Sequence, residues 1–113
     1  MAPNNKKLVL KGVPASAGIA TGKARIITDA AKAKDFREGD ILVTTITDPT
    51  MVSLMAKSAA IVCDMGSITS HPSIVSRELG IPCVVGTKKA TTVLKNGMAV
   101  KVNGSKGEVY RLS

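Results

Sequence analysis

Short apolar runs, separated by glycine, proline and polar turns, predict a domain built mainly from β-strands. Strands are expected where β-branched and aliphatic residues stand together between such breaks, at residues 8–10, 23–27, 40–45, 59–63, 83–85, 98–102 and 109–112. The run at 59–63 is apolar throughout and is followed by Asp64 and Gly66, which is typical of a strand buried on both faces. Residues 1–6 are expected to form a leader outside the fold.

Apolar residues at helical spacing predict helices in the middle of the chain. The segment 50–57 places Met51, Leu54 and Met55 on one side, and 72–79 carries apolar residues at Ile74, Val75 and Leu79. Gly80 follows the second of these helices at the position that favours a left-handed cap, and Pro82 prevents its continuation. Residues 88–94 are expected to form a further helix.

The order of these elements predicts a mixed α/β fold. Strand 59–63, helix 72–79 and strand 83–85 form a strand-helix-strand unit, which predicts a parallel, right-handed crossover. Strands 98–102 and 109–112 are joined by a glycine-containing turn and are expected to pair as a hairpin. The short strands together indicate a sheet curled into a barrel or a sandwich.

Composition limits the function classes. The chain has 113 residues and a formal net charge of +8, from 16 Lys and Arg against 8 Asp and Glu, which fits one domain. No apolar run approaches the roughly 18 residues of a membrane span. Cys63 and Cys83 lack metal or redox spacing, which favours buried free thiols and a cytoplasmic protein. The basic residues are dispersed and aromatic residues make up 2%, so the charge indicates anionic partners or phosphorylated substrates rather than nucleic acid.

Candidate chemistry gathers in the loop between strand 59–63 and helix 72–79. The loop holds one glycine, several hydroxyl side chains and the single histidine of the chain, namely Gly66, Ser67, Thr69, Ser70 and His71. His71 is expected at the start of the helix, where unpaired amides and the helix dipole stabilise an anion. The same field favours a neutral, nucleophilic imidazole near pH 7. Such a ring can carry a phosphoryl group, with the hydroxyls of Thr69 and Ser70 fixing the ring or solvating the phosphoryl oxygens.

Simpler interpretations remain open from the residues alone. A single histidine is more often a surface or structural residue than a catalytic one. Thr69 and Ser70 are also common helix caps. No cluster of metal ligands and no GxSxG elbow is present, which argues against a metal centre and a serine hydrolase. The glycines between residues 12 and 22 fit no phosphate-loop spacing and indicate turns.

Several short motifs stand out along the chain: GVPASAG at 12–18, GDILV at 39–43, TDP at 47–49, TSH at 69–71 and RELGIPCVVG at 77–86. Together they resemble the phosphohistidine domain of the phosphoenolpyruvate-utilising enzymes. This family includes phosphoenolpyruvate synthase, pyruvate phosphate dikinase and enzyme I of the sugar phosphotransferase system. The resemblance covers about residues 12–112, and its central part is specific.

The resemblance implies a swivelling β/β/α domain that carries phosphate between two sites. It assigns the phosphorylated histidine to His71, the loop threonine to Thr69, the first loop glycine to Gly66, and a threonine that bonds the imidazole to Thr47. It places magnesium and ATP or phosphoenolpyruvate on partners, which are an ATP-grasp domain or subunit and a pyruvate-, phosphoenolpyruvate- or other acceptor-binding TIM barrel. No cofactor is expected on this domain itself.

The chain departs from the family pattern at three points. Ser67 replaces a second loop glycine, so a positive φ there would be strained. Pro72 and Ser73 replace two alanines, and Pro72 removes one amide donor. The partner domains are absent from these 113 residues, which leaves open a separate carrier subunit or one domain of a longer chain. Arg77 is a candidate for holding the phosphoryl group, or a solvated helix residue.

Two main hypotheses follow. The first is a phosphoryl carrier in which His71 is transiently phosphorylated. The second is a docking or regulatory module with the same fold that is not phosphorylated, and the departures at 67 and 72 are its only support. Nucleic-acid binding is a weaker third option, and the acceptor of the phosphoryl group stays open.

Overall fold

The computed structural model describes residues 6–112 and shows eight strands with a few short helices. The elements follow one another along the chain as β1 (Lys6–Lys11), β2 (Val13–Ser16), β3 (Ile19–Ile26), the 3-10 turn η1 (Ala30–Lys32), β4 (Ile41–Thr44), η2 (Pro49–Met51), α1 (Val52–Lys57), β5 (Ala60–Cys63), α2 (His71–Leu79), β6 (Cys83–Val85), α3 (Ala90–Val93), β7 (Ala99–Asn103) and β8 (Glu108–Leu112). The leader expected over residues 1–6 lies outside the described residues, except that Lys6 begins β1 and so belongs to the fold.

All the strands belong to one curled sheet with the order β1-β8-β7-β3-β4-β5-β6-β2. β3, β4, β5 and β6 run parallel, and the remaining neighbours are antiparallel. β1 and β2 are consecutive in the chain but lie at opposite ends of this order, so the sheet must curl until its edges approach. A Cβ on Gly12, between them, would lie 2.4 Å from the carbonyl oxygen of Val85, so only glycine fits this junction. The curled sheet of short strands is confirmed.

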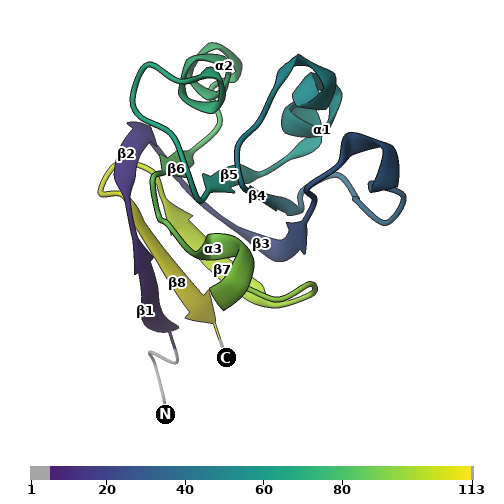
Figure 1. Ribbon diagram of the computed structural model, residues 1–113. Helices are drawn as coiled ribbons and strands as arrows, with labels where there is room; N and C mark the ends of the chain where they lie inside the picture. Colours follow the sequence, from purple (N-terminus) through teal and green to yellow (C-terminus); the bar gives the residue numbers. More distant parts are fainter. Residues whose placement is uncertain (1–5, 113) are drawn as a thin grey trace.

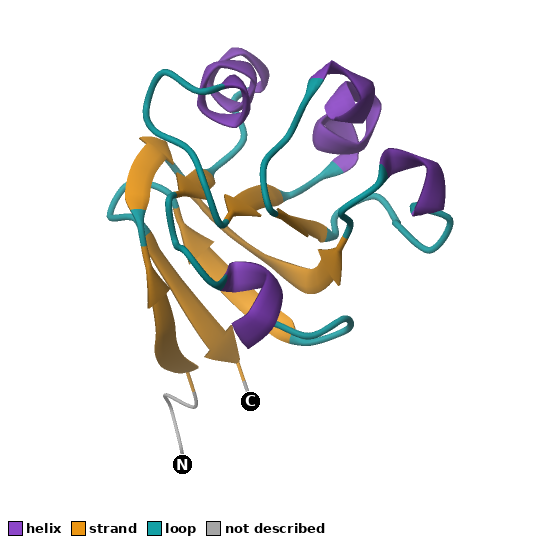
Figure 2. Ribbon diagram, in the orientation of Figure 1, coloured by secondary structure: helices purple, strands orange, loops and turns teal. Residues whose placement is uncertain are grey.

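Two apolar cores divide the molecule into three layers. One core fills the inside of the curled sheet and holds Val43 and Val62 together with Val100 and Val109 from the antiparallel part. The other lies between the parallel strands and the helices α1 and α2, which cover one face of the sheet (Figures 1 and 2). The β/β/α layering expected from the family resemblance is therefore confirmed.

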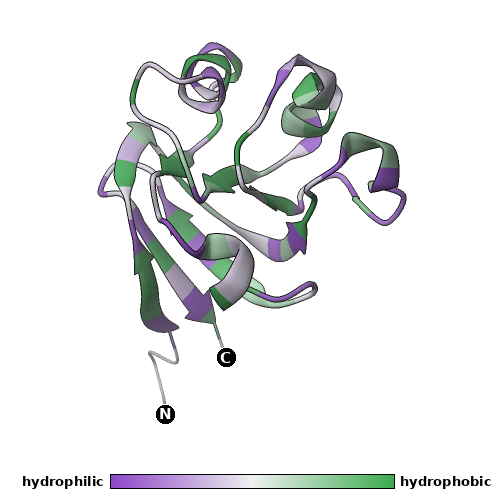
Figure 3. Ribbon diagram, in the orientation of Figure 1, coloured by the Kyte–Doolittle hydropathy of each residue, from purple (hydrophilic) through white to green (hydrophobic). Residues whose placement is uncertain are grey.

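The central strands supply both cores because successive side chains point to opposite faces. In β5, Ala60 and Val62 enter the inner core, whereas Ile61 and Cys63 face the helices. Every residue of β4 and β5 is buried, which confirms the prediction of a strand covered on both faces. Figure 3 shows β5 as one of the most hydrophobic segments of the sheet.

Three elements differ from the expected ones. β2 was not predicted, because Pro14 and the surrounding glycines look like a turn, yet it pairs with β6 as an edge strand, where proline is tolerated. β3 starts earlier than expected because its first half pairs with β7 and its second half with β4. The expected helix at 88–94 shrinks to Ala90–Val93, since Lys88 has a φ of +78° and Asp64 accepts the Thr91 amide instead.

The unit β5-α2-β6 carries the loop with the candidate chemistry. β5 and β6 pair in parallel, as predicted, with Ile61 opposite Cys83. Gly80 ends α2 in a left-handed conformation with a φ of 72°, again as predicted. Within residues 6–112 no helix is long and apolar enough to span a bilayer.

Candidate functional site

His71 is the first residue of α2 and lies at the carboxyl end of the parallel strands. Ser70 is the N-cap, and Pro72 occupies the second helical position, where its missing amide breaks no helical hydrogen bond. The imidazole is half-buried, whereas the Pro72 side chain behind it is buried. The strand-to-helix loop thus holds the imidazole at the surface, and the residue that follows it is anchored in the fold.

A buried threonine fixes one nitrogen of this ring. Thr47 follows β4, has only 4% of its surface exposed, and places its Oγ1 2.7 Å from Nδ1 of His71. Which of the two atoms donates depends on the imidazole tautomer. The structure therefore brings together the threonine and the histidine that the family resemblance pairs, although 24 residues separate them.

The loop before His71 is held by the side chains of the N-cap residue and of the first turn of α2. The hydroxyls of Ser70 and Ser73 both donate to the carbonyl oxygen of Ser67, at 2.7 and 2.6 Å. The Ser67 hydroxyl lies 3.2 Å from that of Thr69 on the exposed side. Gly66 has a φ of +116°, but Ser67 does not have a positive φ, so the strain considered for a serine at this position does not arise.

The first turn of α2 has no side-chain cap. Ser70 stands at the N-cap, but its hydroxyl bonds the backbone of Ser67 and makes no capping bond to the helix. Ser70 is therefore not the ordinary cap that its position suggests. Uncapped amides at a helix N-terminus are donors for an anion, so the N-terminal turn at His71 favours negative charge.

Arg77 lies on the same helix but is engaged elsewhere. Its Nη2 donates to the carbonyl oxygen of Ile68 at 2.8 Å, and its Nη1 donates to that of Ala15, in β2, at 2.9 Å. Both recorded partners are backbone carbonyls, and the contact with a phosphoryl group suggested by the sequence remains a prediction.

Asp48 is the charged side chain that stands next to the histidine contact. The hydroxyl and the amide of Thr50 donate to its carboxylate, and these bonds, with a smaller contribution from nearby His71, hold the pKa of Asp48 below its usual value. The carboxylate is fully exposed, so it is ionised at neutral pH and adds a negative charge to this part of the surface.

Exposed apolar side chains lie on the segments that carry Thr47 and His71, and of these only Ile74 is noted from the sequence, as an apolar residue of the helix. Their exposed fractions range from 36% to 57%, and we call them the apolar collar: Ile46, Met65, Ile68 and Ile74. They come from the loop after β4, the loop after β5 and the first turns of α2, and Ile46 reaches the position beside Gly66. The signal available in the sequence was apolar residues inside otherwise polar loops.

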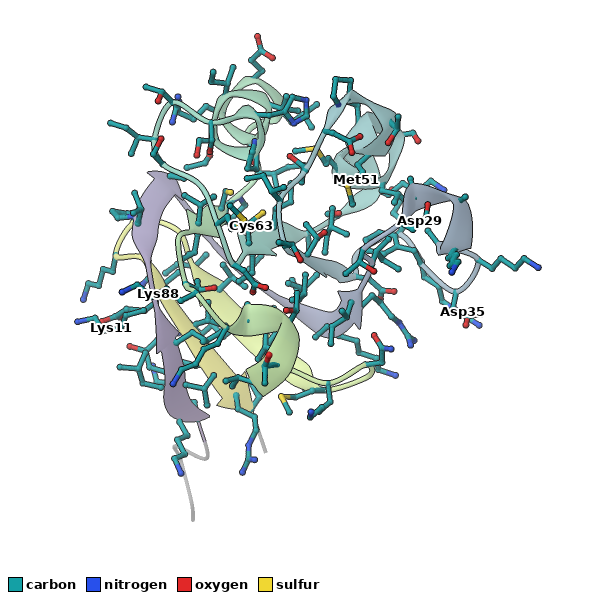
Figure 4. The ribbon with its side chains drawn as sticks, in the orientation of Figure 1. Lys11, Asp29, Asp35, Met51, Cys63 and Lys88 are labelled. Atoms are coloured by element: carbon teal, nitrogen blue, oxygen red, sulfur yellow. The ribbon has the colours of Figure 1, made fainter. Side chains whose placement is uncertain are left out.

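Two buried thiols lie beneath the site. Cys63 and Cys83 are free and fully buried, as predicted, and Figure 4 places Cys63 centrally below α2. The Sγ of Cys83 is 3.9 Å from the carbonyl oxygen of Pro72. Burial raises the pKa of Cys83 to about 11 and raises that of Cys63 further. Both thiols are therefore neutral packing groups at physiological pH.

The geometry can be compared with known proteins. The family model described as "PEP-utilising enzyme, mobile domain" matches residues 36–107, which include Thr47, the loop and His71. The chain belongs to this family. The resemblance noted from its sequence motifs is thereby confirmed for a mobile domain of phosphoenolpyruvate-utilising enzymes.

Relatives of this mobile domain are parts of much longer proteins. It is 57% identical over 105 residues to phosphoenolpyruvate synthase of Pyrococcus furiosus, covering 93% of this chain and 13% of the relative. It is 58% identical over 104 residues to a probable phosphoenolpyruvate synthase of Archaeoglobus fulgidus, covering 92% and 14%. The chain thus spans only a small part of the length of these relatives.

A solved structure of the family shares the fold. The solution structure titled Enzyme I superposes with a TM-score of 0.61 and 29% sequence identity, covering 71% of the mobile domain and 33% of that chain. The similarity supports transferase and phosphotransferase chemistry as the family context.

Proposed function

We propose that this mobile domain is a phosphoryl carrier in which Nε2 of His71 is transiently phosphorylated. The observation that carries the proposal is the Thr47 contact: Oγ1 lies 2.7 Å from Nδ1, which leaves Nε2 as the nitrogen without this partner. In the tautomer with its proton on Nδ1, the ring donates to Thr47 and keeps a lone pair on Nε2. The hydroxyl can either donate or accept, so the contact occupies Nδ1 without itself fixing the tautomer. The reactive form in this proposal is the tautomer with its proton on Nδ1, which is nucleophilic at Nε2.

The transfer step is a displacement at phosphorus. The Nε2 lone pair forms the N–P bond while the bond from phosphorus to the leaving oxygen breaks, and the electron pair leaves with ADP or with enolpyruvate. The proton stays on Nδ1, and this N–H donates a hydrogen bond to the Thr47 Oγ1. The uncapped amides at the start of α2 favour the added negative charge. The reverse displacement at a second site passes the group to the acceptor.

The domain requires partners for this cycle. We propose that the magnesium used in this cycle is held by the partners, as the family resemblance implies. We propose that one partner is an ATP-grasp nucleotide-binding domain or subunit. The other binds pyruvate, phosphoenolpyruvate or another acceptor.

The apolar collar is the surface that would meet each partner. The side chains of Ile46, Met65, Ile68 and Ile74 are 36–57% exposed on the segments that carry Thr47 and His71. Docking of a partner there would remove them from water and exclude water from the phosphoryl group. The cytoplasmic location expected from the sequence remains a prediction.

Phosphate labelling tests the proposal. The chain is incubated with ATP- or phosphoenolpyruvate-using partner subunits and radiolabelled donor, and the product is assayed for acid-labile, alkali-stable phosphate. His71 is the only histidine, so phosphohistidine reports this residue without peptide mapping. We expect labelling of the wild-type chain and none of folded His71→Asn. Equal labelling of the variant rules out the role of His71, and labelling of neither chain favours the unphosphorylated docking module.

A further inference from the structure

Two polar side chains of α2 and the side chain of its N-cap residue face back toward the loop that precedes the helix. Ser70, Ser73 and Arg77 are spaced three and four residues apart, which places them along one face of a helix. Each of them binds a carbonyl oxygen of the loop: Ser70 and Ser73 that of Ser67, and Arg77 that of Ile68. The helix therefore holds its own leading loop through two successive carbonyls.

Arg77 extends this attachment to the edge of the sheet. Its two Nη atoms are 2.8 Å from the Ile68 oxygen and 2.9 Å from the Ala15 oxygen, so one planar group joins the loop to β2. A guanidinium presents donors in a fixed fork that can span two acceptors, whereas a lysine ammonium is a single compact charge on a flexible stem. The contact uses the shape of arginine as well as its charge.

Holding these carbonyls also determines where the loop amides point. In a trans peptide the N–H lies opposite the C=O, and the described residues contain no cis peptide bond. With the Ser67 and Ile68 oxygens turned toward α2, the N–H groups of Ile68 and Thr69 are directed away from it. The Thr69 amide approaches only the Ser67 hydroxyl, at 3.4 Å. The hydrogen bonds from Ser70, Ser73 and Arg77 to these carbonyl oxygens thus keep the two amide donors on the outer side of the loop.

We propose that Arg77 is a positioning residue that clamps the loop 66–70 and so sets where α2 and His71 begin, with Ser73 as a second tie. Arg77 acts through the loop and makes no contact with the phosphoryl group. The consequence for phosphoryl transfer rests on the proposed function, whereas the consequence for loop order does not. A phosphoryl-binding Arg77, the role suggested by the sequence, makes a different prediction for a lysine at this position.

The test compares Arg77→Lys and Arg77→Gln with the wild-type chain. The first readout is amide hydrogen exchange of Ser67 and Ser70, whose amides are bonded within the loop at 3.1 Å each. The second is the rate of His71 labelling. We expect both variants to speed exchange at these amides and to slow labelling, each by about tenfold, because both lose the fork. Arg111→Lys, at an exposed position of β8, is the matched control and should leave both readouts unchanged.

Ser73→Ala provides a milder second variant. It removes one hydrogen bond from a fully buried serine while alanine retains the helix, so exchange at Ser67 and Ser70 should rise by less than in Arg77→Gln. Ser53→Ala, at an exposed position of α1, is its control.

The outcomes separate the two proposals. If Arg77→Lys labels like the wild type, and Arg77→Gln loses labelling with unchanged loop exchange, Arg77 holds the phosphoryl group and the clamp is wrong. If exchange rises in both variants but the wild-type chain is never labelled by any donor, the clamp stands and the carrier function fails.

Discussion

At the scale of single residues, the site depends on one hydroxyl, one imidazole and one glycine. Thr47 is buried by the fold, and its hydroxyl meets the half-buried His71 ring. Gly66 takes a φ of +116° so that the chain can turn out of β5 toward that ring. The specific motif led us to expect that Thr47 and His71 meet, and the structure places them in contact, whereas their roles in phosphoryl transfer stay predictions. The sequence did not reveal the contact between Ser67 and Ser73. Both residues depart from the family pattern, and nothing in a sequence shows that two such residues lie close together.

Thr47→Val tests the hydroxyl with little change of shape. The imidazole loses the partner of Nδ1, so its tautomer and orientation are no longer fixed, and labelling of His71 should slow by about five- to tenfold. Thr47→Ser keeps a hydroxyl and should restore most of the rate. A Thr47→Val chain that labels as fast as the wild type would show that the contact does not prepare the ring.

Gly66→Ala tests the turn against a matched glycine. A Cβ at Gly66 would lie 2.8 Å from the Ser70 Oγ and 3.2 Å from the Val85 Cβ, whereas Gly39 has a φ of +89° with nothing within 4 Å. Gly39→Ala should cost about 1–2 kcal/mol in the free energy of unfolding, from the left-handed conformation alone. Gly66→Ala should cost about 1–3 kcal/mol more from overpacking. Urea unfolding measures both, and equal losses would contradict the packing described here.

At the scale of elements, α2 carries the proposed nucleophile, the proposed clamp and part of the proposed docking surface in nine residues. Its existence, its end at Gly80 and its parallel neighbours follow from apolar spacing and turn residues. The direction of its polar side chains does not, because which carbonyls they meet depends on how the loop folds back. β2 was missed for a related reason: an edge strand containing proline has the local pattern of a turn and is defined only by its pairing with β6.

Two exposed apolar residues of α2 allow the docking surface to be tested within one helix. Ile74 is 44% exposed one turn after His71, and Leu79 is 41% exposed at the other end. Each Xaa→Ser substitution should change stability by no more than about 0.5 kcal/mol. Ile74→Ser should slow phosphoryl transfer from a partner by about tenfold, the scale of one interface side chain, and Leu79→Ser should not. Similar rates for both variants would remove Ile74 from the contact surface.

At the scale of the whole molecule, two cores support a site on the outer surface. The inner core closes the curled sheet, and the outer core, with both thiols, fixes α1 and α2 over the parallel strands. Short apolar runs predicted most of the strands, and the uninterrupted run at 59–63 predicted the burial of β5 on both faces. The closure of the sheet depends on which distant segments pair, such as β1 with β8. A local sequence pattern does not show which strand will be its neighbour.

The buried thiols predict a loss of stability at alkaline pH. Folding raises the pKa of Cys83 from 9.0 to about 11, and that of Cys63 is also raised, by burial in both cases. The unfolded chain therefore ionises first, so their contribution is complete below pH 9 and declines as pH rises from 9 toward 11, by at most about 1.4 kcal/mol per pH unit for each thiol. Urea unfolding across this range should show a shallower decline in the Cys63→Ala/Cys83→Ala variant. Parallel pH profiles would contradict the burial of neutral thiols.

The most direct measurement is nuclear magnetic resonance of the phosphorylated chain with ¹⁵N-labelled histidine. The single imidazole gives one pair of ring nitrogens, and coupling to ³¹P identifies the one that carries phosphate. We predict coupling to Nε2, with Nδ1 remaining on the Thr47 hydroxyl. Coupling to Nδ1, or phosphate found on a serine or threonine with the imidazole unmodified, would contradict the account.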